Sequence, residues 1–140
     1  MNETQALREI PFFSGLEAQD LSAIVQVGDR VKFEAGTPIV EVGDQGDAMY
    51  VILSGSAEVE VGGRYHTLTR GAVFGEMALI SKKKRSASVE AVEPVEALRV
   101  PADGFRQFLM EHPSVAIAML ESMADRLREV QNRIDAWIGS

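Results

Sequence analysis

The sequence from Phe74 to Val89 reads F-G-E-M-A-L-I-S-K-K-K-R-S-A-S-V. Gly75 stands at the start of a short helical turn, where the absence of a side chain lets a ligand approach the backbone. The free N–H groups of such a first turn attract an anion. Arg85 follows ten residues later and adds a planar guanidinium, whose paired donors suit phosphate oxygens. The stretch therefore predicts an anion site.

Glu76 is the diagnostic residue of this stretch. A carboxylate beside a phosphate repels it, unless its purpose is to accept a hydrogen bond from a neighbouring hydroxyl such as a ribose 2′-OH. Arg85 then offsets both negative charges, and the set suits a singly charged cyclic phosphate. Taken singly, each feature has a simpler explanation: Glu76 as a favourable charge at a helix start, Arg85 as a surface ion pair, and the lysines as a solvated loop.

The charge of the whole chain contrasts with this stretch. The net charge is −7, which argues against binding of polymeric DNA or RNA, because such binding neutralises many phosphates. Against that background Lys82, Lys83, Lys84 and Arg85 form a local positive island. A small anion is attracted to such an island.

The composition indicates one ordinary domain. The chain has 140 residues, of which 46% are hydrophobic and 25% charged. It contains no cysteine, which excludes disulfides and thiolate chemistry and makes the cytoplasm the expected location. The polar N-terminus is unlike a signal peptide, and no segment is apolar enough to span a membrane. His66 and His112 lie far apart in the sequence, so no metal site is predicted.

Residues 1–28 are expected to be helical and residues 29–100 to form strands. Ser14 and Glu17 have the spacing of a capping box, which predicts a helix start at Ser14, and a shorter helix is expected from Thr4 to Ile10. Between 29 and 100, short apolar stretches alternate with glycines, a spacing typical of an antiparallel sandwich or barrel. The alternation over 57–61 predicts a strand, and Gly62-Gly63 predicts a tight hairpin.

Residues 101–138 are expected to return to helix. Pro101 and Asp103 open a short helix, His112-Pro113 interrupts it, and a long helix follows from Pro113 to Ile138. Apolar residues recur on the long helix at alternating spacings of three and four, as in a heptad seam: Leu120, Met123, Leu127, Val130, Ile134 and Trp137. We expect a homodimer through this seam. The alternative is an amphipathic helix that packs on its own domain.

The order and spacing of these motifs resemble a known family. The stretch 74–89 is similar to the phosphate-binding cassette of cyclic nucleotide-binding domains, such as those of cAMP-dependent protein kinase regulatory subunits, cyclic nucleotide-gated channels and the bacterial catabolite activator protein. The segments 7–16 and 43–55 resemble the family's entry helix and its glycine-marked hairpins. The resemblance covers nearly the whole chain. It implies an α+β fold, an antiparallel β-roll (double-stranded β-helix or jelly roll) with N-terminal helices and a long C-terminal helix, as one domain over 1–140.

The resemblance also implies a role for each matching residue. Gly75, Met77 and Ala78 would present their backbone to the ligand, Glu76 would accept the ribose 2′-OH, and Arg85 would hold the phosphate. Ser86 would add a hydroxyl to the phosphate or meet the 2-amino group of guanine, so both cAMP and cGMP remain possible ligands.

Two positions depart from the family pattern. Lys84 stands where many members have proline before the arginine. Val130 and Gln131 stand where the catabolite activator protein uses hydroxyl residues to contact adenine, so the base contact is open.

The expected function is that of a sensor. Ligand binding would move the long helix through a hinge between Phe105 and Pro113. Two alternatives are a sensor fragment of a transcription factor that lacks its DNA-binding domain, and a docking or dimerisation module that binds no ligand. No nucleophile, acid–base pair or metal cage is recognisable, so neither enzymatic activity nor a cofactor is predicted.

Overall fold

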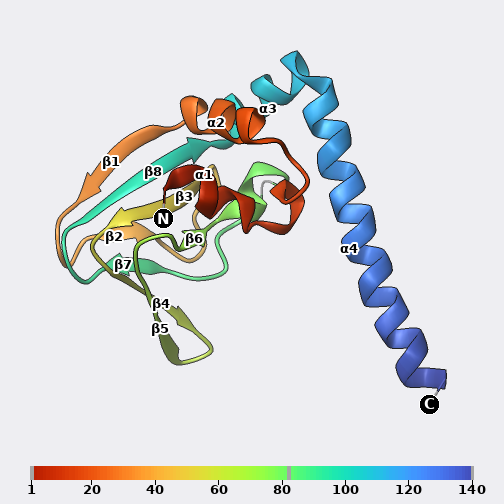
Figure 1. Ribbon diagram of the computed structural model, residues 1–140. Helices are drawn as coiled ribbons and strands as arrows, with labels where there is room; N and C mark the ends of the chain where they lie inside the picture. Colours follow the sequence, from red (N-terminus) through yellow and green to blue (C-terminus); the bar gives the residue numbers. More distant parts are fainter. Residues whose placement is uncertain (1, 82, 140) are drawn as a thin grey trace.

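The protein is built around two four-stranded antiparallel sheets that face each other as a β-roll (Figure 1). The computed structural model describes residues 2–81 and 83–139. The first sheet has the order β1 (Asp29–Phe33), β8 (Val95–Pro101), β3 (Ala48–Ser54), β6 (Val73–Phe74), and the second has β2 (Pro38–Val40), β7 (Val89–Ala91), β4 (Ala57–Val61), β5 (Arg64–Leu68). The α+β class and the antiparallel roll predicted from the sequence are confirmed.

Strand β3 separates two apolar cores. Its side chains alternate between the two faces of the sheet, and all of them from Ala48 to Ile52 are buried. Met49 and Val51 pack in the core under the helices, whereas Tyr50 and Ile52 pack in the core between the sheets. A strand covered on both faces reads as a continuous apolar run, as β3 does.

Helical segments from both ends of the sequence cover the outer face of the first sheet or extend beyond it. They are α1 (Glu3–Arg8), the 3₁₀ turn η1 (Pro11–Phe13), α2 (Ala18–Val27), α3 (Ala102–Glu111) and α4 (Pro113–Gly139). Phe13 and Phe105 are fully buried in this layer, and their rings lie 5.7 Å apart between centroids. The contact joins the N-terminal helices to α3, so the two ends of the sequence share one core.

The predicted helix start at Ser14 is wrong. The Ser14 hydroxyl donates to the Pro11 carbonyl at the end of η1, and α2 begins after Glu17 without a side-chain cap. The capping box lies instead at the start of α1, where the Asn2 side chain accepts from the Gln5 amide and the Gln5 side chain accepts from Asn2. Pro11 explains the difference, because proline is favoured at the first position of a helical turn and here begins η1. The Ser14 hydroxyl is then bonded to the Pro11 carbonyl at the end of that turn.

The β4–β5 hairpin projects from the roll (Figure 1). Gly62 and Gly63 form its turn with φ of +59° and +78°, which only glycine adopts freely. The predicted strand and hairpin are confirmed.

The helix α4 lies partly on the domain and partly away from it (Figure 1). It begins at Pro113 and is separated from α3 only by His112, the C-cap of α3, as predicted from the His112-Pro113 pair. Val115 and Met119 are buried, but the apolar seam residues beyond them are exposed. Of the helices that the structure describes, none has the length and apolar character to cross a membrane.

Candidate functional site

Gly75 makes the sharp turn that opens the candidate site. It has a left-handed φ of +78° and precedes the 3₁₀ turn η2 (Glu76–Leu79). A Cβ at this position would overlap the Arg85 guanidinium and lie 3.0 Å from the Ala48 carbonyl oxygen. Both the backbone angle and the close approach of Arg85 therefore require glycine, and the first amides of η2 are left without partners inside the turn.

Arg85 lies across the floor of the site with only 8% of its side chain exposed. Its Nη2 atom donates to the Ala48 carbonyl at 2.7 Å and lies 3.7 Å from an Asp47 carboxylate oxygen. The guanidinium carbon is 6.0 Å from the centre of the Tyr50 ring, within the range of a cation–π contact. A guanidinium has five N–H donors, more than these contacts use, so donors remain for a ligand.

The loop before Arg85 is fixed by backbone hydrogen bonds to the segment 43–46. The Gly46 amide donates to the Lys83 carbonyl at 3.1 Å, the Arg85 amide donates to the Asp44 carbonyl at 2.6 Å, and the Gly43 amide donates to the Arg85 carbonyl at 2.9 Å. A Cβ at Gly46 would lie 2.7 Å from the Lys83 carbonyl oxygen. The glycines of 43–46 thus hold the loop at close range and orient the arginine that follows.

A cavity of about 420 Å³ opens between η2, this loop and the second sheet. Its volume lies in the range of small-molecule sites, which is roughly 300–1,000 Å³. Five of the six predicted binding residues line it, with Glu76 the exception, and the full lining is Val40, Gly46, Val59, Phe74, Gly75, Met77, Ala78, Ser81, Lys83, Lys84, Arg85, Ser86, Ala87 and Val89.

The cavity has a cationic side and an apolar side. Lys83, Lys84 and Arg85 contribute the positive charges, and Ser81 and Ser86 contribute hydroxyls. Lys82, the first residue of the positive island, lies outside the described residues. Val40, Val59 and Val89 come from neighbouring strands of the second sheet and supply aliphatic wall. Such a site suits a small anion that carries a flat apolar group.

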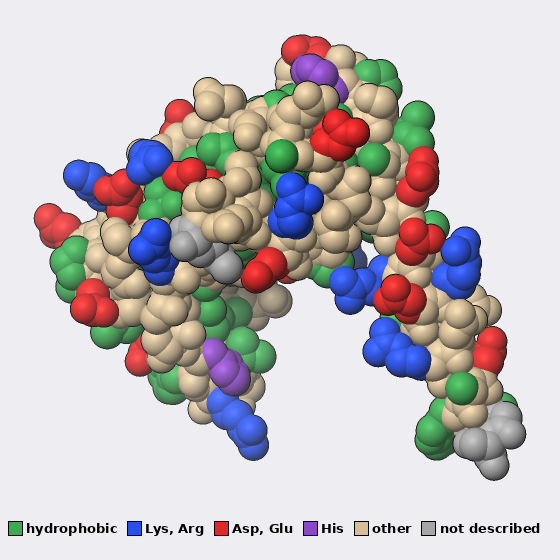
Figure 2. Space-filling view, viewed as in Figure 1, with side chains coloured by type: hydrophobic (Ala, Val, Ile, Leu, Met, Phe, Trp, Pro, Cys, Tyr) green, Lys and Arg blue, Asp and Glu red, His purple; other side chains and the backbone are tan. Residues whose placement is uncertain are grey.

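Glu76 and Val130 lie on a different surface from this cavity. Both line a groove of about 630 Å³ between η1, η2 and α4, which opens beside the hollow under α4 in Figure 2. Gln131 is exposed and lines neither the cavity nor the groove described here. The structure therefore does not bring these three residues to the cavity: Glu76 faces the groove side of η2, and Val130 and Gln131 lie on α4, which stands away from the roll.

Asp47 is a residue of the site that the sequence reasoning missed. Its carboxylate lies 3.7 Å from Arg85 and 3.4 Å from Arg99 on β8, and its carbonyl accepts from the Ala102 amide at the start of α3. The residue thus links the arginine of the cavity to the helix that leads to α4. Its position directly before the buried run of β3 is the sequence signal that could have drawn attention to it.

Comparison with known proteins agrees with this geometry. The model of the family described as "Cyclic nucleotide-binding domain" matches residues 30–112. A cAMP-dependent protein kinase regulatory subunit of Aspergillus fumigatus is 40% identical over 106 residues, covering 74% of this chain and 26% of the relative. A cyclic AMP receptor protein of Thermus thermophilus is 33% identical over 131 residues, covering 89% of this chain and 61% of the relative.

The fold also matches a solved structure. The N-terminal domain of a transcriptional regulator from Streptomyces coelicolor superposes with a TM-score of 0.76 at 26% identity, covering 92% of this chain and 94% of that one. The chain spans only about a quarter of the length of the fungal regulatory subunits that it matches. The family match takes in more than half of the chain and includes Gly75 and Arg85. This chain belongs to the cyclic nucleotide-binding domain family.

Proposed function

We propose that this domain binds a 3′,5′-cyclic nucleotide, cAMP or cGMP, in the 420 Å³ cavity and acts as a regulatory sensor, not as a catalyst. The observation that carries the proposal is the contact between Gly75 and Arg85, where a nearly buried guanidinium lies against a glycine turn at the wall of the cavity. The names of the fungal and Thermus relatives, which both refer to cAMP, support that ligand.

The phosphate end of the ligand would lie between η2 and Arg85. The guanidinium would pair with a phosphate oxygen, the backbone of Gly75, Met77 and Ala78 would face the sugar-phosphate, and the Ser86 hydroxyl would add a donor. The cyclic phosphate carries one negative charge, which the cations on this side of the cavity offset.

Glu76 would accept the hydrogen bond of the ribose 2′-OH. Glu76 lines the groove and not the cavity, whereas Gly75 lines the cavity and Met77 lines both. The role therefore requires the side chain to turn over the edge of η2 when the nucleotide enters. Rotation about side-chain bonds of a partly exposed glutamate is inexpensive compared with a charge-assisted hydrogen bond.

The junction of α3 and α4 would transmit binding to α4. The helical conformation is interrupted at His112-Pro113. The cassette contacts α3 through a hydrogen bond of 2.9 Å from the Arg106 guanidinium to the Ile80 carbonyl. A rotation at this junction would carry Val130 and Gln131 toward the base. The nucleotide would then favour one position of α4 over another, which is the condition for a switch.

The exposed seam of α4 would pair with a second copy of the chain. Six apolar residues at heptad spacing are all between 39% and 80% exposed: Leu120, Met123, Leu127, Val130, Ile134 and Trp137. Two such helices side by side would bury the seams against each other.

The test is calorimetric titration of the protein with cAMP and cGMP. We expect one or both to bind with a Kd well below about 1 mM, which corresponds to about 4 kcal/mol. Absence of binding at that concentration would contradict the proposal and leave a docking module that binds no nucleotide.

An analogue that differs from cAMP in one hydroxyl tests the role of Glu76 in binding. The analogue 2′-deoxy-cAMP lacks only the ribose hydroxyl, so it should bind the wild type about tenfold more weakly than cAMP does. In Glu76→Ala the two ligands should bind equally. A persistent difference in the variant would place the hydroxyl against another residue.

A further inference from the structure

The polar and aliphatic sides of the cavity indicate where the base of a nucleotide would lie. Arg85, Gly75 and Ser86 occupy its polar side, so a phosphate held there directs the remainder of the ligand toward the aliphatic wall. Val59 of β4 belongs to that wall and is the lining residue that comes from the projecting hairpin. The base would therefore pack against β4.

The pairing of β4 with β5 puts His66 beside Val59. The two residues are direct partners in the antiparallel register, and such partners point to the same face with their Cβ atoms about 4.5–5.5 Å apart. The face of Val59 is the face that lines the cavity, so the His66 side chain lies on that face, next to a residue of the cavity wall, although His66 is not itself a lining residue. Thr67, the next residue, pairs with Glu58 and points to the opposite face of the hairpin.

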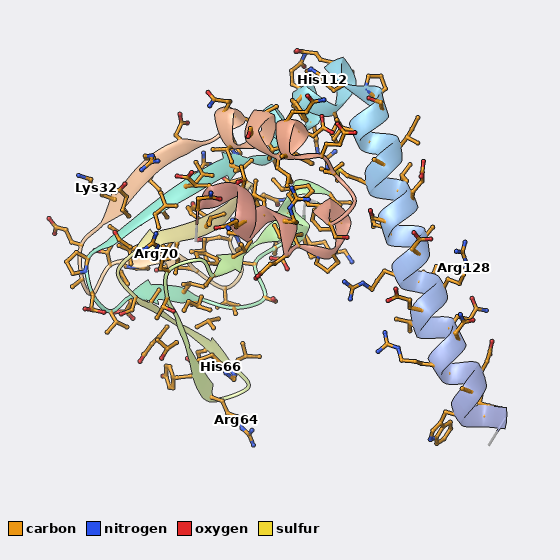
Figure 3. All side chains as sticks on the ribbon, viewed as in Figure 1. Lys32, Arg64, His66, Arg70, His112 and Arg128 are labelled. Atoms are coloured by element: carbon orange, nitrogen blue, oxygen red, sulfur yellow. The ribbon has the colours of Figure 1, made fainter. Side chains whose placement is uncertain are left out.

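The imidazole is available to a ligand. His66 is exposed on the hairpin that projects from the roll (Figure 3), and in the described part of the chain it takes part in no hydrogen bond, ion pair or ring contact. Its ring N–H is a donor without a partner among residues 2–81 and 83–139.

We propose that His66 recognises the base, by donating a hydrogen bond to N7 of a purine that packs on Val59. This inference rests on the proposed function and extends it to ligand selection. N7 is an acceptor in both adenine and guanine, and pyrimidines have no such atom in this position. His66 thus selects purine over pyrimidine cyclic nucleotides without choosing between cAMP and cGMP.

The test compares cAMP with 7-deaza-cAMP, in which a C–H replaces N7. Wild type should bind 7-deaza-cAMP about fivefold more weakly than cAMP, the effect of one neutral hydrogen bond. In His66→Ala the affinity for cAMP should fall by about the same factor, and the two ligands should bind equally. Binding of cCMP should change by less than about twofold, and Thr67→Val, on the opposite face of the hairpin, should keep the wild-type preference.

The outcomes separate this inference from the function on which it rests. Binding of cAMP with no difference between the two purine ligands in wild type would overturn the role of His66 while leaving the nucleotide site intact. A preference for N7 that persists in His66→Ala would do the same. Failure of every nucleotide to bind wild type would overturn the proposed function itself.

Discussion

The phosphate-binding cassette (residues 74–89) and the distal half of α4 differ sharply in how their key side chains are held. Arg85 in the cassette has only 8% of its side chain exposed. Its partners are the Ala48 carbonyl on β3 and the Asp47 carboxylate in the loop before β3. Leu127 and Trp137 on α4 are 67% and 80% exposed. The roll therefore fixes the phosphate site by its own contacts, whereas the position of α4 depends on a ligand or a second chain.

The largest effect should come from Arg85→Ala. Truncation of a nearly buried, hydrogen-bonded cation costs about 3 kcal/mol, so the Kd for cAMP should rise about 100-fold by calorimetry. Arg128→Ala removes the same charge from the 69%-exposed side chain on α4 and should leave the Kd unchanged. Arg85→Lys keeps the charge without the planar fork and should recover only part of the affinity. Equal effects of Arg85→Ala and Arg128→Ala would mean that net charge alone attracts the ligand.

The next effect concerns the seam of α4. Leu127→Asp places a charge in the proposed dimer contact and should weaken dimerisation about 30-fold in sedimentation equilibrium, while the melting temperature of the roll stays the same. Glu129→Ala, off the seam, is the control. A wild type that stays monomeric at high concentration would show that the seam instead folds onto its own domain.

Gly75→Ala tests how tightly the cassette is built. The left-handed backbone angle costs about 1–2 kcal/mol with an alanine side chain, and the overlap with the Arg85 guanidinium should also weaken cAMP binding about tenfold. Gly62→Ala carries a similar strain, with φ of +59° and open space around it, and should lower the melting temperature without changing binding. If both variants bind alike, the approach of Arg85 to Gly75 has no role in the site.

The smallest effect should come from Asp47→Asn. The Asp47 side chain is 65% exposed and its ion pairs to Arg85 and Arg99 are 3.7 and 3.4 Å long, so their loss is worth well under about 1 kcal/mol. We expect the Kd for cAMP to change by less than about threefold. A change as large as that of Arg85→Ala would instead make Asp47 an essential positioning residue of the site.

The sequence was sufficient to predict the parts that depend on local rules. Gly62-Gly63, the strand over 57–61 and the break at His112-Pro113 were predicted because turns, alternation and proline act over a few residues. The grouping of Gly75 with Arg85 followed from motif spacing. The helix start at Ser14 was wrong because the capping pattern also fits a residue that ends a 3₁₀ turn.

Other parts of the site depend on contacts between distant segments. Asp47 meets Arg99 only because β3 pairs with β8, and His66 lies beside Val59 of the cavity wall only through the β4–β5 register. No periodic pattern in the sequence predicts either contact. The side of η2 to which Glu76 turns depends on packing around the turn, which sequence spacing does not determine.

A crystal structure with cAMP tests the central claim most directly. We predict that the nucleotide fills the cavity between η2, Arg85 and the second sheet, with its phosphate on the Arg85 guanidinium and the Gly75 turn and with Glu76 turned to the ribose 2′-OH. Nucleotide bound in the groove under α4 instead, or with its phosphate away from Arg85, would contradict the account.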